Sequence, residues 1–579
     1  MNSNSSSRIR FVLGCISLFA LILISKLYYI QILHGDEYTS EAEAQYSRQT
    51  ATSFERGTIF FETKNRGTIG VATVKEGYSL IMNPKVLRAE VKDISSSFDA
   101  LTQYVKLDKA SFMEKSAKQN DQYEELDKRL DRIAGIAIGE LNIPGIEVHK
   151  DAWRVYPGGS LASHTIGLVG YNDKNEIAGR YGLERFYEKT LRRTSGASNI
   201  NFFAELFSNI KGHDGGTFSA QNKEGDIVAT IDPTVESELE KVLSRTRSLW
   251  KSDSIGGIIM NPATGEIYAM SSLPDFDPNN LKDIKDPVVF SNKLVESVYE
   301  MGSIIKPLTM AVGLDSKVIT SESTYDDAGF LLLNTKRISN FDGKARGVIQ
   351  MQEILSQSLN VGAATIALKV GNENFSRYFL SFGFGDITGI DQPNEQKGRV
   401  TNLKSGREIE QATASYGQGI SMSPMTTIRA LSVIANGGML IRPHIVKEIR
   451  YTDGSIEKLT PNPGVRVVQK STSDEVTRML VQVVDKAIAK AHPEIHMDRY
   501  SIAAKTGTAQ IADPVNGGYY TDRYLHSFFG YFPAYSPKYI VFLYQVYPKG
   551  AEYASQTLTD PFTELAKFMI NYYEVPPDR

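Results

Sequence analysis

The sequence predicts a chain that ends in an α/β domain, with a mixed region before it and one apolar helix near the N-terminus. Three observations lead to this prediction. A long apolar run occupies residues 11–33, residues 34 to 225 show no regular periodicity, and residues 226–579 have strand-like runs at both ends with helical patterns between them. A sheet assembled from such distant pieces and flanked by helices is typical of an α/β domain.

The length and composition support several domains of a globular protein. With 579 residues, of which 41% are hydrophobic and 23% charged, the chain can form two or three domains that each bury a core. The formal net charge of -3 gives no indication of nucleic-acid binding, so we expect none. Cys15 is the only cysteine, which excludes an intramolecular disulfide and a cysteine-based metal site.

The apolar run 11–33 is long enough to cross a bilayer, since a helix of this length spans roughly 34 Å. Arg8 and Arg10 precede it and the first acidic residue follows it. The positive-inside rule therefore places residues 1–10 in the cytoplasm and the bulk of the chain outside the cytoplasmic (inner) membrane. A cleaved signal peptide would share the basic start, but residues 26–29 offer no small-x-small cleavage site. We expect an uncleaved single-pass anchor.

The region from residue 34 to 225 is predicted to be a separate mixed domain. A charged stretch at 122–141 is expected to be helical. Residues 196–225 are rich in Gly, Ser and Asn, and we interpret them as a loop that leads to a domain boundary.

Residues 226–579 have a regular pattern and form the second predicted domain. After the apolar run 227–231, Asp232-Pro233 is typical of a helix start, and the helix is expected to continue through Leu243. Runs at 256–260 and 266–271, joined by Asn-Pro-Ala-Thr-Gly, predict a hairpin. Further helices are expected at 303–314, 352–369, 423–436 and 562–573, and further strands at 502–511, 527–532 and 539–546.

Three short strings in this domain belong together chemically. They are Ser303-Ile304-Ile305-Lys306, Ser358-Leu359-Asn360 and Lys505-Thr506-Gly507. S-x-x-K alone occurs by chance in any long chain. The significance of the three strings therefore depends on their order and on the elements in which they lie. Ser303 follows a glycine at a helix start, Ser358 precedes a helix, and Lys505 lies in a predicted strand.

These residue types at this spacing can activate a serine. Residues i and i+3 share a helix face, so the amine of Lys306 can reach the hydroxyl of Ser303, and the helix N-terminus favours an oxyanion nearby. To act as a base, Lys306 must have its pKa lowered from about 10.4 by roughly three units, or about 4 kcal/mol. Burial and a second cation, Lys505, could supply this shift. Ser358 and Asn360 would relay the proton and hold the substrate amide.

The three strings in this order resemble the motifs of penicillin-binding proteins and class A β-lactamases. Longer strings around them resemble the transpeptidase domain of class B penicillin-binding proteins throughout residues 226–579. Three strings in the preceding region resemble the motifs of that family's elongated pedestal, or dimerisation-like, domain. The transpeptidase strings are residues 257–267, 299–303, 416–420, 435–438, 505–510 and 527–534, and the pedestal strings are 56–59, 154–158 with His164 and Gly167, and 182–184.

Two departures from the family pattern stand out. Phe60-Phe61-Glu62-Thr63 replaces the usual Asp-Arg-Asn-Gly, and Met301 replaces a usual proline. We expect these two departures to affect the contacts of the pedestal domain with its partners more than the catalytic chemistry.

The resemblance implies a serine transpeptidase/β-lactamase-like fold with a mostly antiparallel sheet, and the activity of a membrane-anchored peptidoglycan D,D-transpeptidase. Ser303 would attack the terminal D-Ala-D-Ala bond of a stem peptide, and an amine from a neighbouring strand would resolve the acyl-enzyme. The backbone amides of Ser303 and Thr508 would form the oxyanion hole. Lys505, Thr506, Gly507 and Thr508 would bind the substrate. β-Lactams would acylate Ser303, and no metal or organic cofactor is expected.

The resemblance also implies partners. These are peptidoglycan stem peptides, β-lactams, a membrane-embedded glycan polymerase of the SEDS family, other cell-division membrane proteins and the inner membrane. The strings from His526 to Ala534 favour the cell-division branch over the elongation branch. The acceptor amine and the oligomeric state stay open.

Alternative functions have weaker support. For a metal hydrolase, His492-Pro493-Glu494-Ile495-His496 has the wrong order for H-E-x-x-H, so we interpret it as a surface connection. A class D β-lactamase or β-lactam sensor would resemble S-x-V where Asn360 stands, and a hydrolase has no use for residues 34–225. A bifunctional class A synthase would need acidic glycosyltransferase motifs, which are not found. Intact motifs argue against a catalytically idle scaffold. His164 and His526 are expected to be structural.

Overall fold

The computed structural model describes residues 54–193 and 223–579 except positions 283, 334, 461 and 462, together with residues 19 and 26. Apart from these two residues, the expected membrane anchor, 11–33, lies outside this part of the chain, as does most of the expected loop 196–225. Among the described helices, none has the length and apolar character needed to span a bilayer.

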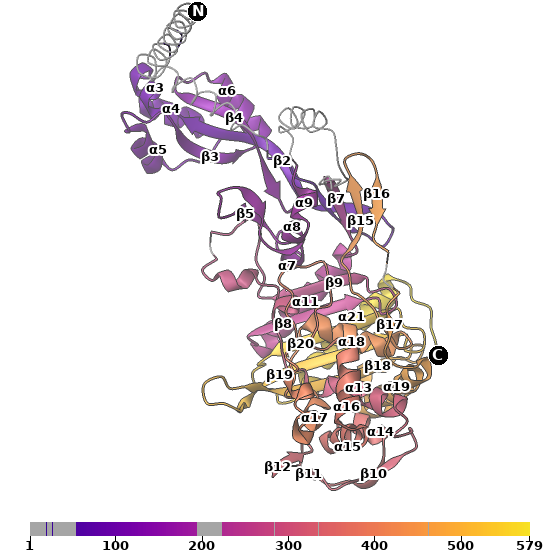
Figure 1. Ribbon diagram of the computed structural model, residues 1–579. Coiled ribbons are helices and arrows are strands. Elements are labelled where there is room, and N and C mark those ends of the chain that lie inside the picture. The colour runs from indigo at the N-terminus through magenta and orange to yellow at the C-terminus, as the bar shows by residue number, and fades with distance from the viewer. Residues whose placement is uncertain are drawn as a thin grey trace, which may run out of the picture. The chain divides into compact units, whose positions relative to one another are not determined.

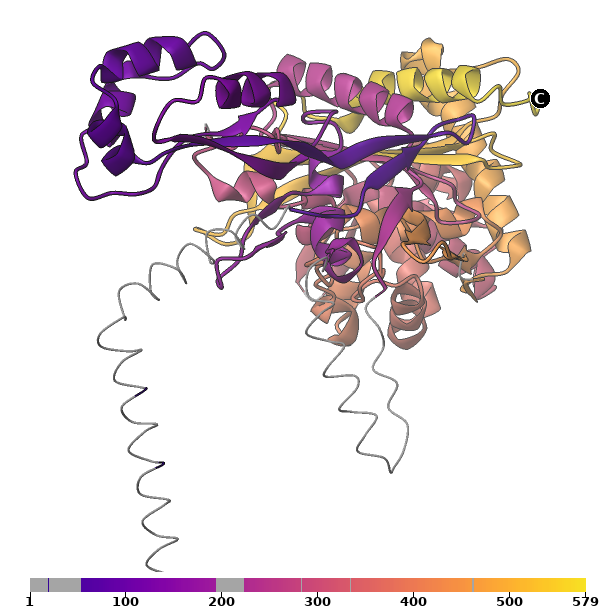
Figure 2. The same ribbon diagram turned by 90° about the horizontal axis from the view of Figure 1, so that it is seen from above.

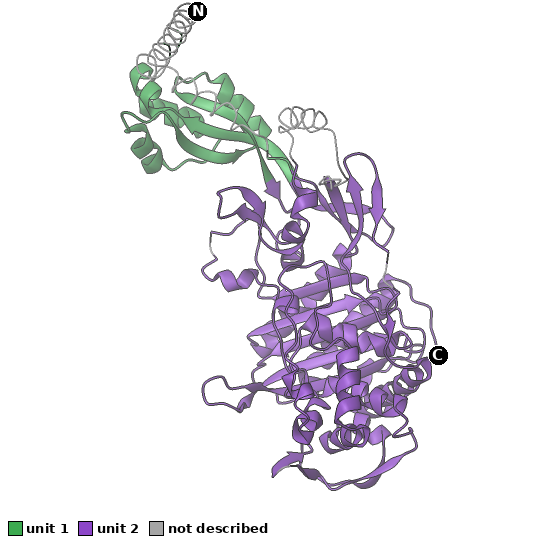
Figure 3. Ribbon diagram, viewed as in Figure 1, with its two compact units in different colours: residues 1–55, 74–153, 194–213 green, residues 56–73, 154–193, 214–579 purple. Residues whose placement is uncertain are grey.

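The described chain divides into two compact units (Figure 3). One unit contains residues 74–153, with 54–55, and the other contains residues 56–73, 154–193 and 223–579. The division does not follow a single cut along the sequence, because the chain passes from one unit to the other within two long strands, β2 (Thr68–Met82) and β4 (Ile146–Val155).

The smaller unit packs short helices on the second half of β2. Tyr78 of β2 pairs with Leu130 of β3 in an antiparallel ladder, and β4 also pairs with β2. Its core contains Leu80, Met82, Leu87, Phe98, Leu101, Phe112, Leu130 and Ile138, all buried. The elements are α3 (Pro84–Glu90), α4 (Ile94–Leu101), α5 (Lys109–Ser116), β3 (Glu124–Leu130) and α6 (Arg132–Glu140).

The helix expected at 122–141 is wrong over its first half, because residues 124–130 form β3. Pairing with β2 outweighs the helical propensity of this charged segment. A helix begins only after Asp131, whose side chain accepts a hydrogen bond from the backbone of Ala134.

In the larger unit, one sheet brings together three distant parts of the chain. β1 (Ile59–Glu62) pairs antiparallel with the first part of β2 and parallel with β7 (Gly225–Ala229). β15 (Val446–Tyr451) and β16 (Ile456–Lys458) continue the sheet beyond β7. Phe60-Phe61-Glu62, which departs from the family pattern, is therefore strand rather than turn.

A second sheet of five strands forms the centre of the larger unit (Figure 1). Its order is β18 (Ala503–Ala512), β19 (Tyr519–Phe532), β20 (Tyr539–Val546), β8 (Ser254–Met260) and β9 (Ile267–Leu273), and every neighbouring pair is antiparallel. The hairpin and the three late strands predicted from the sequence are thus confirmed. β18 lies at the edge of this sheet.

Two long helices, α11 (Pro233–Trp250) and α21 (Ala554–Tyr572), lie side by side on this sheet (Figure 2). The side chain of Asp232 caps α11 by accepting hydrogen bonds from the backbone of Thr234 and Val235, as expected for Asp-Pro at a helix start. α21 begins eight residues earlier than predicted and contains Pro561.

Of the three helices expected between the strands, one is interrupted. The expected helix 352–369 is interrupted, because Ser358 has a left-handed backbone with φ of 56° and separates α14 (Gln352–Ser356) from α15 (Asn360–Val370). The helix expected at 303–314 begins as a 3-10 turn, η3 (Gly302–Ile305), and continues as α13 (Lys306–Asp315). The expected helix 423–436 is α18 (Pro424–Ala435).

The larger unit contains further elements. They are α7 (Ser163–Ile166), β5 (Val169–Tyr171), β6 (Ile177–Gly179), α8 (Gly182–Phe186), α9 (Glu188–Leu191), η2 (Pro287–Phe290), α12 (Lys293–Glu296), β10 (Thr324–Asp327), β11 (Phe330–Leu333), β12 (Lys336–Ser339), β13 (Gly347–Gln350), α16 (Asn372–Ser381), η4 (Thr401–Lys404), α17 (Glu408–Ala414), β14 (Met439–Leu440), β17 (Val465–Arg466), α19 (Lys470–Gln482), the π-helical η5 (Val483–Ile488), α20 (Ala489–Ala491) and η6 (Pro493–Ile495).

The three strings that resemble pedestal motifs meet in a buried ion network of the larger unit. Glu184 is fully buried and pairs with Arg56 at 2.5 Å and with Arg154 at 2.7 Å. Burial alone would raise the pKa of Glu184, but the charges of Arg154 and Arg56 outweigh it and lower this pKa. The network joins Glu184 to Arg56, 128 residues earlier in the sequence, and to Arg154, 30 residues earlier.

Candidate active site

Ser303 lies in η3, held against the edge strand β18 by the glycine before it. Gly302 has φ of +66°, and a Cβ atom there would lie 2.7 Å from the carbonyl oxygen of Thr508. The backbone N–H of Gly302 donates to the carbonyl oxygen of Gly417 at 3.1 Å. Only glycine permits both the left-handed backbone and the close approach, so the position of Ser303 beside β18 depends on Gly302.

Lys306 follows on the first turn of α13 and is 1% exposed. Its Nζ lies 2.9 Å from Oγ of Ser303 and 3.2 Å from Oγ of Ser358. It also lies 2.6 Å from the carbonyl oxygen of Ser358 and 2.8 Å from Oδ1 of Asn360. The last two oxygens can only accept hydrogen bonds. A neutral amine would give its two hydrogens to them and keep a lone pair for a serine hydroxyl.

The environment favours this neutral state. Burial, and after it the charge of Lys505, lowers the pKa of Lys306 well below the usual range of lysine. Burial also lowers the pKa of Lys505, to about 7. Both effects favour a neutral Lys306, and Lys505 is the candidate for the charged member of the pair.

Ser358 links the two lysines. Its hydroxyl oxygen lies 3.2 Å from Nζ of Lys306 and 3.1 Å from Nζ of Lys505. The left-handed backbone of Ser358 ends α14, directs its carbonyl oxygen to Lys306 and lets α15 begin at Asn360. The hydroxyl can therefore pass a proton between the two amines.

β18 carries the third string at the edge of the sheet. Lys505 is 3% exposed and also donates to the carbonyl oxygen of Thr506 at 3.0 Å. A Cβ atom on Gly507 would lie 2.4 Å from Oγ of Ser527 and 2.8 Å from the carbonyl oxygen of Met301. Gly507 thus lets β18 approach the segment that carries Ser303.

These groups surround a cavity of about 840 Å³. Six of the eight predicted site residues line it, and Lys306 reaches it only through its contacts with Ser303, Ser358 and Asn360. Gly507 does not line it and acts through the packing of β18. The six are Ser303, Ser358, Asn360, Lys505, Thr506 and Thr508.

Several lining residues were missed by sequence reasoning. Arg337 and Phe341 come from the β12 region, and Tyr553 precedes α21. The Phe341 and Tyr553 rings meet edge to face with centroids 6.0 Å apart. These residues lie outside every motif that the sequence shows, so no signal in the sequence indicated them.

The histidines considered in the sequence lie outside this cavity. His526 is fully buried, with Nδ1 2.9 Å from Oγ1 of Thr557. His164 is also buried, with Nε2 2.8 Å from the carbonyl oxygen of Val289. Burial lowers the pKa of both imidazoles, to about 4 for His526. Their contacts are those of structural residues.

Comparisons with known proteins identify the family of the chain. A model of the penicillin binding protein transpeptidase domain matches residues 255–566, and a model of the penicillin-binding protein dimerisation domain matches residues 52–236. Stage V sporulation protein D of Bacillus subtilis is 28% identical over 569 residues, which cover 97% of this chain and 84% of that protein. The peptidoglycan D,D-transpeptidase FtsI of Buchnera aphidicola is 25% identical, and the alignment covers 98% of this chain and 96% of that protein.

Among solved structures, penicillin binding protein 3 of Mycobacterium tuberculosis in complex with aztreonam has a similar fold. It superposes with a TM-score of 0.65 at 21% identity, covering 91% of this chain and 98% of that one.

Proposed function

The chain belongs to the penicillin-binding protein transpeptidase family, in its class B, and on that premise we propose that it is a serine-type peptidoglycan D,D-transpeptidase. It cross-links stem peptides through an acyl-enzyme on Ser303, and β-lactams acylate the same serine. The observation that carries the proposal is the 2.9 Å contact between Ser303 Oγ and the buried amine of Lys306.

Acylation begins when neutral Lys306 takes the hydroxyl proton of Ser303. Oγ attacks the carbonyl carbon between the two terminal D-alanines, and the backbone N–H groups of Ser303 and Thr508 stabilise the oxyanion. The tetrahedral intermediate collapses when the C–N bond breaks. The leaving amine of D-Ala takes a proton that Lys306 supplies through Ser358, whose hydroxyl contacts both lysines.

Deacylation repeats these steps with a different nucleophile. An amine of a second stem peptide loses a proton to the same relay, attacks the acyl-enzyme carbonyl and returns Ser303 to its hydroxyl form. Asn360 takes part by holding the amine of Lys306 in place.

Substrate binding uses the edge of the sheet. Charged Lys505, with Thr506 and Thr508, receives the terminal carboxylate, and the unpaired backbone of β18 can add the stem peptide as a further strand. Gly507 keeps this edge close to Ser303. A carboxylate at Lys505 would raise its pKa again, so the bound substrate itself stabilises the charged form.

The remaining parts of the proposal concern location and partners. Residues 1–10 would lie in the cytoplasm, 11–33 would anchor the chain in the inner membrane, and 34–225 and 226–579 would form the extracytoplasmic pedestal and transpeptidase domains. A SEDS-family polymerase and other division proteins would be its membrane partners. Similarity to an FtsI protein over nearly the whole chain supports a septal role.

The proposed activity can be tested with the full-length chain in detergent, a peptide that ends in D-Ala-D-Ala and an amino-acid acceptor. We expect equal amounts of free D-Ala and acceptor-linked peptide by mass spectrometry, and neither with Ser303→Ala. Release of D-Ala with only hydrolysed peptide would instead favour a hydrolase related to β-lactamases. No D-Ala release from folded protein would favour the idle scaffold.

A further inference from the structure

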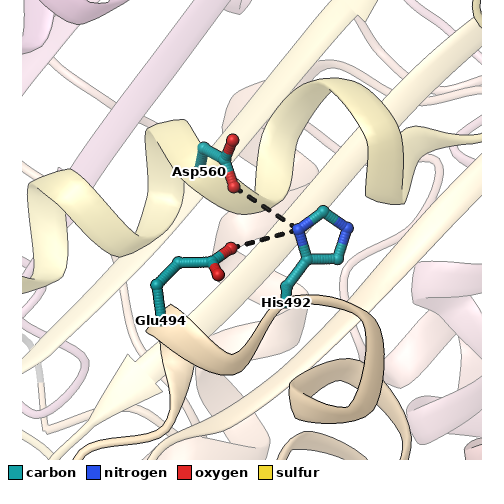
Figure 4. Close-up of side chains that lie close together, drawn as sticks. All are labelled: His492, Glu494 and Asp560. Atoms are coloured by element: carbon teal, nitrogen blue, oxygen red, sulfur yellow. Dashed lines mark hydrogen bonds and ion pairs between the residues drawn. The ribbon is translucent and has the colours of Figure 1, made fainter.

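Three side chains on the larger unit converge away from the catalytic cavity. Nδ1 of His492 lies 3.1 Å from Oε1 of Glu494 and 3.4 Å from Oδ1 of Asp560 (Figure 4). All three groups place one ligand atom within 4.8 Å of the others. Glu494 lies in η6, while Asp560 comes from α21, so the cluster joins segments more than sixty residues apart.

The single hydrogen on Nδ1 of His492 cannot serve both carboxylates fully. Nδ1 of an imidazole carries at most one hydrogen, and two carboxylate oxygens point at it from different segments. The two carboxylates also repel each other. A divalent cation would satisfy all three groups at once.

The spacing suits such an ion. With metal–ligand bonds of about 2.0–2.2 Å, tetrahedral ligands lie roughly 3.3 Å apart, close to the two contacts of His492. One imidazole nitrogen with two carboxylate oxygens is a donor set for Zn²⁺ and similar divalent ions. We propose that His492, Glu494 and Asp560 form a binding site for a divalent transition-metal ion, represented by Zn²⁺, with water completing the coordination.

The neighbouring His496 provides an internal contrast. It also contacts two carboxylates, but through different ring nitrogens: Nδ1 lies 3.2 Å from Asp485, and Nε2 lies 3.5 Å from Asp498. The two ring nitrogens point away from each other, so these carboxylates cannot share one ion with the imidazole. Convergence on a single nitrogen distinguishes His492.

The ion would tie together two segments that border the catalytic cavity. His492 follows α20, which continues from η5, and Val483 and Ile488 of η5 line the cavity. The first turn of α21 lines it with Ala554 and Ser555. The sequence predicts a surface connection without metal at residues 492–496. The site we infer is a structural metal site at that surface. It holds two segments together and takes no part in the acyl transfer.

The test uses the tag-free full-length chain in detergent, stripped of metal and dialysed against increasing Zn²⁺. We expect about one saturable equivalent per chain and an unfolding temperature that rises with Zn²⁺. His492→Gln should weaken binding at least tenfold, since even changes outside the ligand shell cost 10- to 100-fold. Asp560→Asn, a change on the helix surface, should also weaken it, while the matched control His496→Gln should bind as the wild type does.

All variants should share the wild-type unfolding temperature without metal, which separates loss of the site from misfolding. Absence of saturable binding to the wild type would overturn the proposal. Equal binding by the wild type, His492→Gln and Asp560→Asn would also overturn it.

Discussion

The side-chain oxygen of Asn360 accepts a hydrogen bond of 2.8 Å from Nζ of Lys306. The other end of the same amide is fixed, because Nδ2 donates to the carbonyl oxygen of Ser339 at 3.1 Å. The oxygen of Asn360 therefore faces the lysine and cannot exchange places with the nitrogen. Asn360 offers Lys306 an acceptor without a charge, which leaves the low pKa of the amine intact.

Asn360→Asp tests this role of a neutral acceptor. A carboxylate of the same shape would stabilise the protonated lysine and raise the pKa of Lys306. We expect acylation by a β-lactam to fall at least tenfold at pH 7 and to recover as the pH rises toward the new pKa. Stopped-flow measurement of acylation against pH checks this. A rate that stays low at every pH would show that the variant acts through damage to the site.

Gly302→Ala should abolish acylation. The added Cβ would meet the carbonyl oxygen of Thr508, and the left-handed backbone disfavours alanine. Gly454→Ala is the matched control, because Gly454 has φ of +84° and open space around its Cβ position. We expect the control to lose about 1–2 kcal/mol of stability and keep its acylation rate. Equal acylation by the two variants would contradict the account of Gly302.

Glu184→Gln should destabilise the larger unit by about 3–5 kcal/mol, because it leaves Arg154 buried without a counter-charge. The control Asp474→Asn breaks the exposed pair with Lys470 and should change stability by less than about 1 kcal/mol. Urea unfolding followed by tryptophan fluorescence measures both. If the two variants unfolded at the same urea concentration, the buried network would not stabilise the fold.

Glu240→Gln should stabilise the protein only at higher pH. Burial, and after it the charge of Asp275, raises the pKa of Glu240 to about 7, although its Oε1 accepts a hydrogen bond from the backbone of Ala162. Between about pH 4.3 and 7 the folded state therefore binds more protons than the unfolded state, so stability falls as pH rises.

The glutamine keeps the acceptor for Ala162 and removes this titration. We expect a gain of up to roughly 3 kcal/mol at pH 8 and almost none at pH 4. Thermal unfolding at the two pH values measures it. An equal gain at both would contradict the raised pKa.

Much of the larger unit could be predicted from the sequence, because its strands are apolar and its helices carry local signals. Asp232-Pro233 marks the start of α11 through a side-chain cap, which is a local interaction. The errors in the predicted secondary structure lie where contacts between residues far apart in the sequence determine the conformation. Residues 124–130 are mostly charged and become a strand through pairing with β2. Ser358 interrupts a helical pattern at a point where its carbonyl oxygen accepts a hydrogen bond from Lys306.

The candidate site could also be predicted only in part. The motifs indicated Ser303, Lys306, Ser358, Asn360 and Lys505, and the structure brings these five side chains into hydrogen-bond contact. The walls of the cavity were not predictable. Residues such as Phe341 and Tyr553 line it because strands and helices far apart in the sequence converge there.

The identity of the acylated residue tests the central claim most directly. The full-length chain would be incubated with a fluorescent penicillin, beside Ser303→Ala and Lys306→Ala, and the labelled peptide would be mapped by mass spectrometry. We predict a long-lived adduct on Ser303, none in Ser303→Ala, and acylation slowed about 10²- to 10⁴-fold in Lys306→Ala. A label on another residue, or no label on folded wild-type protein, would contradict the account.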